Sequence, residues 1–283
     1  MNISLLSEEN NIYLLKKDNN NYIEFSPNRG GLITKWINDS NSILYFDENR
    51  FLDKSKSIRG GIPILFPICG NLKTNSSIYG KNFLNMMQHG FARNHKWEYE
   101  YIKDKSCLSL LLHQNEETKK YFPYDFKIKI NIYLEVNCLY YEIYIHNNSD
   151  TNMPINFGLH PYFNISDFNK IEFIDFPLNC LNQKKNTIEL TKELLKDINN
   201  GIDLLIYSSG KSSFIDYGFS RKINLVHSSP FDISVIWSDP PRKMVCLEPW
   251  TSPRNSLIEG FRQILIPPNN CHKLCALLSV EKI

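Results

Sequence analysis

This sequence of 283 residues lacks the features that define several common classes of protein. Its 32 Lys and Arg nearly balance its 30 Asp and Glu, and the net charge of +2 is too weak for a nucleic-acid-binding surface. No apolar run approaches the roughly 20 residues that span a bilayer. The first 20 residues also lack the cationic start and apolar stretch of a secretory signal. We therefore expect a cytoplasmic protein that binds neither nucleic acid nor membrane.

Patterns for metal, nucleophile and phosphate sites are also missing. None of the seven cysteines forms a CxxC pair, and the cluster of Cys271, His272 and Cys275 has no second half and lies in an apolar run typical of a strand. We expect free, mostly buried thiols in a reducing compartment. No GxSxG is present, and no GK[ST] follows the paired glycines Gly60 and Gly61, which excludes a serine-hydrolase elbow and a phosphate loop.

Helix signals are scarce, whereas strand patterns fill the chain. Short helices are predicted only at 116–121 and at 191–197, the second with Thr191 as N-cap. The clearest strand is 126–134, where every second residue is apolar. Further strands are predicted at 11–25 (a hairpin around 18–21), 32–37, 43–46, 97–102, 108–113, 139–145, 170–176, 202–207, 222–226, 233–237, 243–247, 262–266 and 273–280. We predict an all-β fold, a large antiparallel β-sandwich with very little helix, in which residues 1–283 form one domain.

Four segments depart from this alternation: 58–71, 86–94, 156–163 and 247–255. Each combines Gly or Pro with a polar or charged residue beside bulky apolar ones. Loops held by a rigid scaffold are where binding and catalytic groups concentrate. We therefore expect the functional residues in these four segments.

Two of these segments carry groups suited to proton transfer. His160 precedes Pro161, which favours an extended backbone and ends the ladder, so His160 should lie at a strand end. Glu248 follows the apolar run 244–247 and precedes Pro249, which places it at the mouth of a buried strand. A glutamate is rarely buried unless it is paired. Glu248 either forms an ion pair with an arginine or acts as a base with a raised pKa, and His160 is either a core histidine or a catalytic one.

The other candidates are suited to binding. His89 and Arg93 flank a compact turn at Gly90, a residue that allows close backbone approach. Arg59 precedes two glycines, Gly60 and Gly61, that allow a tight turn of the chain. This turn should place Arg59 near a cavity. Trp250 either offers a flat face to a sugar ring or fills the core. Each of these residues also has a purely structural interpretation, as a loop residue, a surface arginine or a core aromatic.

Taken together, two histidines, a glutamate and an arginine predict either a His₂Glu metal site or a proton-transfer site without metal. The absence of HxH and HExxH disfavours the metal. A metal site built from ligands in distant segments remains an alternative.

The four segments, in order, are RGGIPILFPICGNL (59–72), QHGFAR (88–93), FGLHPYF (157–163) and LEPWTSPRN (247–255). Together they resemble the aldose 1-epimerase (galactose mutarotase-like) family over almost the whole chain, and most closely its hexose-6-phosphate mutarotase-related branch. The resemblance implies a β-supersandwich fold. It also implies interconversion of the α and β anomers of an aldohexose or hexose 6-phosphate, with no metal and no cofactor.

The resemblance also implies roles for individual residues. Glu248 would take the proton from the C1 hydroxyl, and His160 would protonate the ring oxygen. His89 would hydrogen-bond near the ring oxygen, and Arg59 would bind sugar hydroxyls or a phosphate. An aspartate that grips sugar hydroxyls falls on Asp203.

Several expectations stay open at this point. Asp216 competes with Asp203 for the aspartate position, and Arg59 and Arg93 could clamp a phosphate bidentately. Catalysis near neutral pH requires the pKa values of Glu248 and His160 to move towards 7, which predicts a bell-shaped pH–rate profile. A non-catalytic sugar-binding protein on the same fold is the alternative. The partner is a small sugar or sugar phosphate, and the oligomeric state is undetermined.

Overall fold

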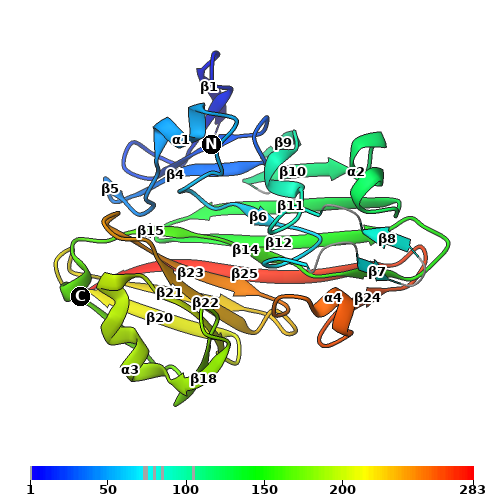
Figure 1. Cartoon of the computed structure of the whole chain (residues 1–283). Helices are drawn as coiled ribbons and strands as arrows, with labels where there is room; N and C mark the ends of the chain where they lie inside the picture. The colour runs from blue at the N-terminus through cyan, green and yellow to red at the C-terminus, as the bar shows by residue number, and fades with distance from the viewer. Residues whose placement is uncertain (1, 73–75, 79–80, 84–85, 104–105) are drawn as a thin grey trace.

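A computed structural model describes residues 2–72, 76–78, 81–83, 86–103 and 106–283. The predicted all-β class is confirmed: most strands belong to three antiparallel sheets, which we call the N-terminal, back and front sheets (Figure 1). The N-terminal sheet contains β1 (Asn2–Ser7), β2 (Ile12–Lys16), β3 (Tyr22–Ser26), β4 (Leu32–Asn38) and β5 (Asn41–Ser42). The predicted hairpin around residues 18–21 joins β2 to β3.

The back sheet contains the longest strands, among them β11, β12 and β25, which run side by side across the molecule (Figure 1). In spatial order its strands are β16 (Ile171–Ile174), β20 (Lys211–Asp216), β21 (Arg221–His227), β25 (Cys271–Lys282), β12 (Cys138–Asn147), β11 (Phe126–Glu135), β10 (Cys107–His113) and β9 (Glu98–Ile102). Along β11, Ile128, Ile130 and Ile132 are buried, as the period of two predicted. The predicted turn between β9 and β10 includes residues 104–105, outside the described residues.

The front sheet carries three of the four irregular segments. In spatial order it contains β18 (Thr187–Leu190), β17 (Asn179–Asn182), β19 (Asp203–Tyr207), β22 (Ile233–Ser238), β23 (Met244–Trp250), β14 (Gly158–Leu159) and β6 (Ile64–Leu65). A further strand, β15 (Tyr162–Asn164), also pairs with β23. Two small two-stranded sheets complete the described strands: β13 (Met153–Ile155) with β24 (Ile264–Ile266), and β7 (Ser76–Ile78) with β8 (Lys81–Phe83).

The helices are short, as expected, but two of them, Glu48–Leu52 and Ser256–Glu259, lie outside the predicted segments 116–121 and 191–197. The helices are α1 (Glu48–Leu52), α2 (Glu116–Tyr121), α3 (Thr191–Leu195) and α4 (Ser256–Glu259), with 3₁₀ turns η1 (Ala92–Asn94), η3 (Phe168–Lys170) and η4 (Lys196–Asn200). The prediction of Thr191 as N-cap was wrong: the cap is Leu190, and Thr191 begins the helix with a buried side chain. Within the described part of the chain, no helix is both long and apolar enough to cross a membrane.

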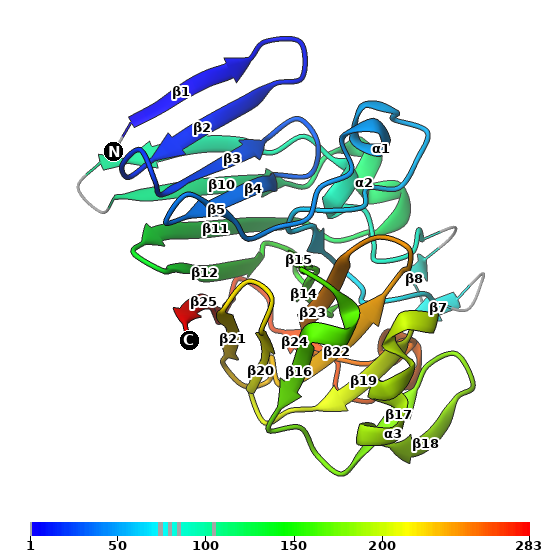
Figure 2. The same ribbon diagram turned by 90° about the vertical axis from the view of Figure 1, so that its left-hand side faces the viewer.

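One hydrophobic core joins all three sheets, and the front sheet has a second face turned away from it (Figure 2). On β23, Val245 and Leu247 belong to this core, whereas Cys246, Glu248 and Trp250 point to the opposite face. We call that opposite surface the site face. The site face is formed by alternate residues of three neighbouring strands, β19, β22 and β23. These residues are Asp203, Leu205, Ile233, Val235, Trp237, Cys246, Glu248 and Trp250.

The strand predictions failed at several places. Residues 43–46 form isolated bridges instead of a strand, and β1 and β20 were missed. The segment 247–255 was expected to be irregular, yet its first four residues continue β23. Pro249 is tolerated inside β23 because its partners on one side, β14 and β15, are interrupted near that point.

Candidate active site

The register of the front sheet brings His160 and Glu248 together although they are distant in the chain. Gly158 pairs with Trp250 and Tyr162 pairs with Cys246, so His160 lies opposite Glu248, midway between these pairs. As predicted, His160 comes directly after a strand, β14. His160 Nε2 lies 3.5 Å from Glu248 Oε2, and both side chains are buried. An imidazole and a carboxyl group therefore meet in one water-poor site.

Glu248 is held in place by Trp250. The indole Nε1 of Trp250 donates a hydrogen bond of 3.0 Å to Glu248 Oε2, and the indole is itself buried at 1% exposure. Burial raises the pKa of Glu248 well above its ordinary value of 4.5, and the charge of Asp203 raises it further. The Trp250 hydrogen bond and the neighbouring arginines oppose that rise. The direction for Glu248 agrees with the expectation for a general base.

His160 is fixed by aromatic side chains. Its ring stacks on Tyr162 with the ring centres 4.6 Å apart, and Trp237 meets its edge at 6.0 Å. Burial lowers the pKa of His160 well below its ordinary value of 6.5, and electrostatic interactions with His89, Arg93 and Arg59 lower it further. We expected this pKa to move towards 7, and it moves the other way, because burial and then the neighbouring arginine charges disfavour an added proton on the ring.

His89 adds a neutral hydrogen-bond donor beside the pair. Its ring centre is 5.4 Å from that of His160. The backbone amide of Gly70 donates a 3.1 Å hydrogen bond to His89 Nδ1, which assigns the proton of the neutral ring to Nε2. Burial lowers the pKa of His89 well below 6.5, and neighbouring arginine charges contribute. His89 is therefore suited to donate a hydrogen bond without gaining charge.

Gly90, which follows His89, occupies a position that no other residue fits. Its φ is +73°, and an added Cβ would lie 2.0 Å from the backbone oxygen of Phe66. Gly260 has nearly the same φ, +72°, but its added Cβ would come no closer than 3.8 Å to a side chain. The two glycines thus share the same backbone requirement and differ in the space available.

This pair of glycines gives a stability prediction. Both Gly90→Ala and Gly260→Ala should lose about 1–2 kcal/mol from the left-handed backbone. Gly90→Ala should lose about 1–3 kcal/mol more, because the methyl group overlaps the backbone of Phe66. Urea denaturation of both variants measures the difference in the free energy of unfolding. Equal losses would contradict the steric argument.

The two candidate arginines, Arg59 and Arg93, each have a partner in the structure. The guanidinium of Arg59 lies 5.3 Å from the ring centre of Trp237, and its Nε is 3.7 Å from Asp239 Oδ2. Arg93, in η1, donates a 2.9 Å hydrogen bond from Nη2 to a backbone carbonyl of the preceding turn. Both arginines contribute to the lowered pKa of His160, so their charges act within the site.

Asp203 lies on the site face and is tied to a residue that we did not single out. Arg254 Nη2 is 2.7 Å from Asp203 Oδ2, and Gln183 Nε2 donates to Asp203 Oδ1 at 2.7 Å. Gly70 makes room for this arginine, since an added Cβ would lie 2.3 Å from Arg254 Cγ. Burial raises the pKa of Asp203, and the charge of Arg254 opposes that rise.

The rival aspartate, Asp216, occupies a different environment. It lies on β20 of the back sheet, fully buried, and its carboxylate accepts hydrogen bonds from Ser166 and from the backbone amides of Gly218 and Phe219. These bonds stabilise a turn and give Asp216 a structural role. Asp203 alone of the two lies on the same sheet face as Glu248.

Sequence reasoning missed Cys246, Arg254 and Trp237, and periodicity could have found only the first of them. Cys246 precedes Glu248 by two positions on one strand, so both side chains point to the site face. Arg254 lies inside the segment 247–255 that was singled out, but nothing local signals its pairing with Asp203. Trp237 reaches the site only through the pairing of β22 with β23.

The fold is an antiparallel β-sandwich, and one face of its front sheet carries a buried histidine–glutamate pair. The sequence pattern of the aldose 1-epimerase family matches residues 12–273. The chain belongs to the aldose 1-epimerase family.

The chain is similar to a curated relative and to solved structures. A "Putative glucose-6-phosphate 1-epimerase" of Cenchrus ciliaris is 27% identical over 252 residues, covering 78% of this chain and 72% of that protein. The crystal structure of the Slr1438 protein from Synechocystis is 34% identical and covers 100% of both chains with a TM-score of 0.92. A galactose mutarotase related enzyme from Lactobacillus acidophilus, 22% identical, covers 96% of this chain and 97% of that one with a TM-score of 0.78 and shares the fold.

Proposed function

We propose that this protein is a mutarotase, an isomerase that interconverts the α and β anomers of an aldose by acid–base opening and closure of the ring. The observation that carries the proposal is the 3.5 Å contact between His160 Nε2 and Glu248 Oε2 inside a buried site. A carboxylate and an imidazole at this spacing can serve the two oxygens of a hemiacetal, because both oxygens are bonded to C1. Membership of the family supports the same reaction.

In the proposed reaction, Glu248 removes the proton from the C1 hydroxyl while His160 gives a proton to the ring oxygen. The C1–O5 bond breaks and leaves the open-chain aldehyde. Rotation about C1–C2 presents the other face of the carbonyl, and the reverse transfers close the ring as either anomer. His89 donates a hydrogen bond near the ring oxygen, and Asp203 accepts hydrogen bonds from sugar hydroxyls.

The pair needs one proton in total. Burial favours the neutral forms, with the proton on the carboxyl of Glu248 and none added to His160. The catalytic form has the proton on His160 and the charge on Glu248, which is the same number of protons. The reactive state therefore forms by moving one proton within the pair, without exchange with solvent.

This proton count predicts the pH dependence. On the acid side activity falls when the pair binds a second proton, and because the pKa of His160 is lowered this limb should lie well below 6.5. On the alkaline side activity falls when the pair loses its only proton, and because the pKa of Glu248 is raised this limb should lie well above 4.5. A profile of kcat/KM against pH tests both limbs. An acid limb at or above 6.5 would contradict the assignment.

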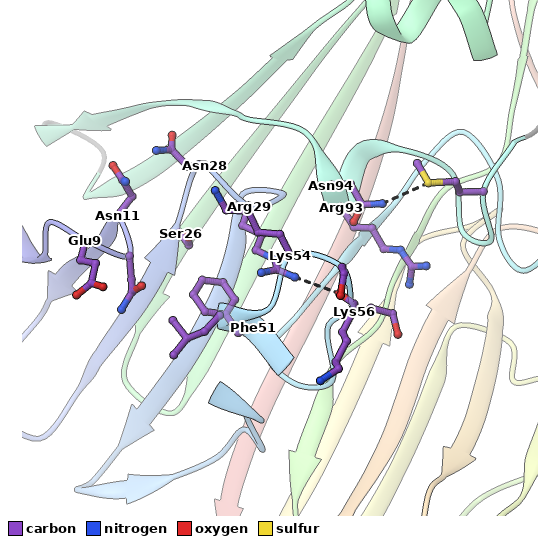
Figure 3. A pocket seen from close by; sticks show the side chains of 15 residues that line it. Glu9, Asn11, Ser26, Asn28, Arg29, Phe51, Lys54, Lys56, Arg93 and Asn94 are labelled. Atoms are coloured by element: carbon purple, nitrogen blue, oxygen red, sulfur yellow. Dashed lines mark hydrogen bonds between the residues drawn. The ribbon is translucent and has the colours of Figure 1, made fainter. Parts of the chain in front are cut away.

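The arginines support a phosphorylated sugar as the better substrate. Among the described residues, a cavity of about 680 Å³ is lined by four cationic residues, Arg29, Lys54, Lys56 and Arg93, and by one acid, Glu9. Figure 3 shows Arg93 at the opposite end of this cavity from Glu9. The described lining of this cavity does not include His160 or Glu248, but Arg93 both lines the cavity and acts electrostatically on His160. We propose that a hexose 6-phosphate places its phosphate against Arg93 and Arg59.

Anomer exchange of glucose, galactose and glucose 6-phosphate, followed by polarimetry or exchange NMR, tests this function. Arg93→Met should raise KM for glucose 6-phosphate about 10–100-fold, the loss expected for one hydrogen bond to a charged group. KM for free glucose should change little. Lys17→Met is the control, because Lys17 pairs with Glu135, outside the site. Sugar binding without any faster exchange would instead support a non-catalytic sugar-binding protein.

A further inference from the structure

A third potential ligand stands beside the proposed catalytic pair. The donor atoms of His160, Cys246 and Glu248 all lie within 4.8 Å of one another, and all three residues are buried. The sheet explains the grouping. Cys246 and Glu248 are alternate residues of β23. His160 lies between β14 and β15, the two short strands that pair with β23. The proposed reaction has no role for the thiol of Cys246.

One of the distances between the donor atoms matches the edge of a tetrahedral metal site. Zinc–ligand distances of about 2.0–2.3 Å place the ligand atoms of a tetrahedral site about 3.3–3.6 Å apart. His160 Nε2 and Glu248 Oε2 are 3.5 Å apart, longer than a good hydrogen bond and within the range of that tetrahedral edge. Trp250 orients the carboxylate and Tyr162 orients the imidazole, so two of the ligands are already positioned.

The donor set selects the kind of ion. An imidazole nitrogen, a thiolate sulfur and a carboxylate oxygen suit borderline-soft zinc, whereas magnesium and calcium prefer oxygen ligands only. A divalent ion bound by one thiolate, one carboxylate and one neutral imidazole carries no net charge. That neutrality matters here, because Arg59 and Arg93 already place positive charge near His160.

We propose that His160, Cys246 and Glu248 form a zinc site that inhibits the protein. Zinc bound there occupies the proton acceptor and the proton donor at once, so a sugar cannot use either. Binding displaces the thiol proton of Cys246 and the single proton of the His–Glu pair into solvent, which balances the charge of the ion. The inhibition rests on the proposed function, whereas the binding does not.

The binding test uses the full chain, stripped of metal with EDTA, and Co²⁺ as a spectroscopic probe. One equivalent of Co²⁺ should produce a thiolate-to-cobalt charge-transfer band together with tetrahedral d–d bands, and Zn²⁺ should displace it. Cys246→Ala and the isosteric Cys246→Ser should abolish the charge-transfer band. In each variant the affinity for Zn²⁺ should fall by at least about 10-fold, the smallest loss seen for removing even an outer partner of a metal site.

Two other buried cysteines are the matched controls. Cys180 lies on β17 of the same sheet and should be replaceable by Ala without effect on the band. Cys69 is the sharper control, since the charge of Glu248 reaches it and contributes to its raised pKa, after burial. A charge-transfer band that survives in Cys246→Ala and Cys246→Ser, or that is lost in Cys69→Ala, would overturn the ligand assignment. So would the absence of saturable binding in the unmodified chain.

Activity separates the two proposals. Zn²⁺ should slow anomer exchange by the unmodified chain, and EDTA should restore it. Cys246→Ser should exchange anomers in the presence of Zn²⁺ concentrations that inhibit the unmodified chain. Equal inhibition of both proteins would overturn the inhibitory role. If the metal-free protein exchanges no aldose, the proposed function fails while the cobalt spectra still decide the zinc site.

Discussion

Glu248→Gln is expected to slow anomer exchange by about 10²–10⁴-fold, the usual contribution of one positioned acid or base. The amide has the shape of the carboxyl group and can accept the same hydrogen bond from Trp250, so the site should keep its geometry. It cannot take a proton from the C1 hydroxyl. The decay of optical rotation of freshly dissolved sugar measures the change.

Glu248→Gln should also change how the free energy of unfolding depends on pH. The pKa of Glu248 is raised by burial, so the folded state holds this proton more tightly than the unfolded state. Its stabilising contribution is fully present below the ordinary value of 4.5 and is lost as the pH rises through the folded-state pKa. Glu248→Gln has no such proton, so its free energy of unfolding should fall less as the pH rises.

Glu24→Gln is the control for both measurements. Glu24 is also buried, on β3 of the N-terminal sheet, where it pairs with Lys35. Its replacement should leave anomer exchange unchanged. Full activity of Glu248→Gln, or a steeper loss of stability with rising pH than in the unmodified protein, would contradict the assignment of Glu248.

His160→Ala is the second variant with a large expected effect, also about 10²–10⁴-fold on anomer exchange. Its removal leaves space beside Tyr162, where the imidazole ring now stacks, and added imidazole should enter that space and restore part of the rate. His113→Ala is the control, because His113 is exposed on β10.

The double variant of His160 and Glu248 gives a stricter test. Because the two residues act as one unit, removing both should cost little more than removing one. Additive losses in the double variant would mean that the residues act in separate steps. An undiminished rate in His160→Ala would remove His160 from the mechanism.

The sequence was sufficient for the fold class because long strands carry a complete pattern. In β11 every second side chain enters the core, and hydrophobic burial alone determines which face is apolar. Strands β6 and β14 have two residues each, too short to show any period. They exist because neighbouring strands supply their partners.

The candidate residues could be predicted, but their geometry could not. His160 and Glu248 were recognisable from their local sequence, whereas their contact depends on the pairing of β14 and β15 with β23. The pKa of His160 was predicted in the wrong direction for the same reason. Its shift depends on burial and on Arg59 and Arg93, whose distance from His160 is a property of the assembled sheet.

The position of β25 has a consequence for how the chain folds. This strand, residues 271–282, lies between β21 and β12 and is the only link between the two halves of the back sheet among the described strands. Before β25 arrives, β12 and β21 both expose unpaired edges, which are prone to join the wrong partner. Contacts that bridge so much of the chain give a high contact order and slow folding. A nascent chain therefore cannot complete this sheet until residues 271–282 have left the ribosome.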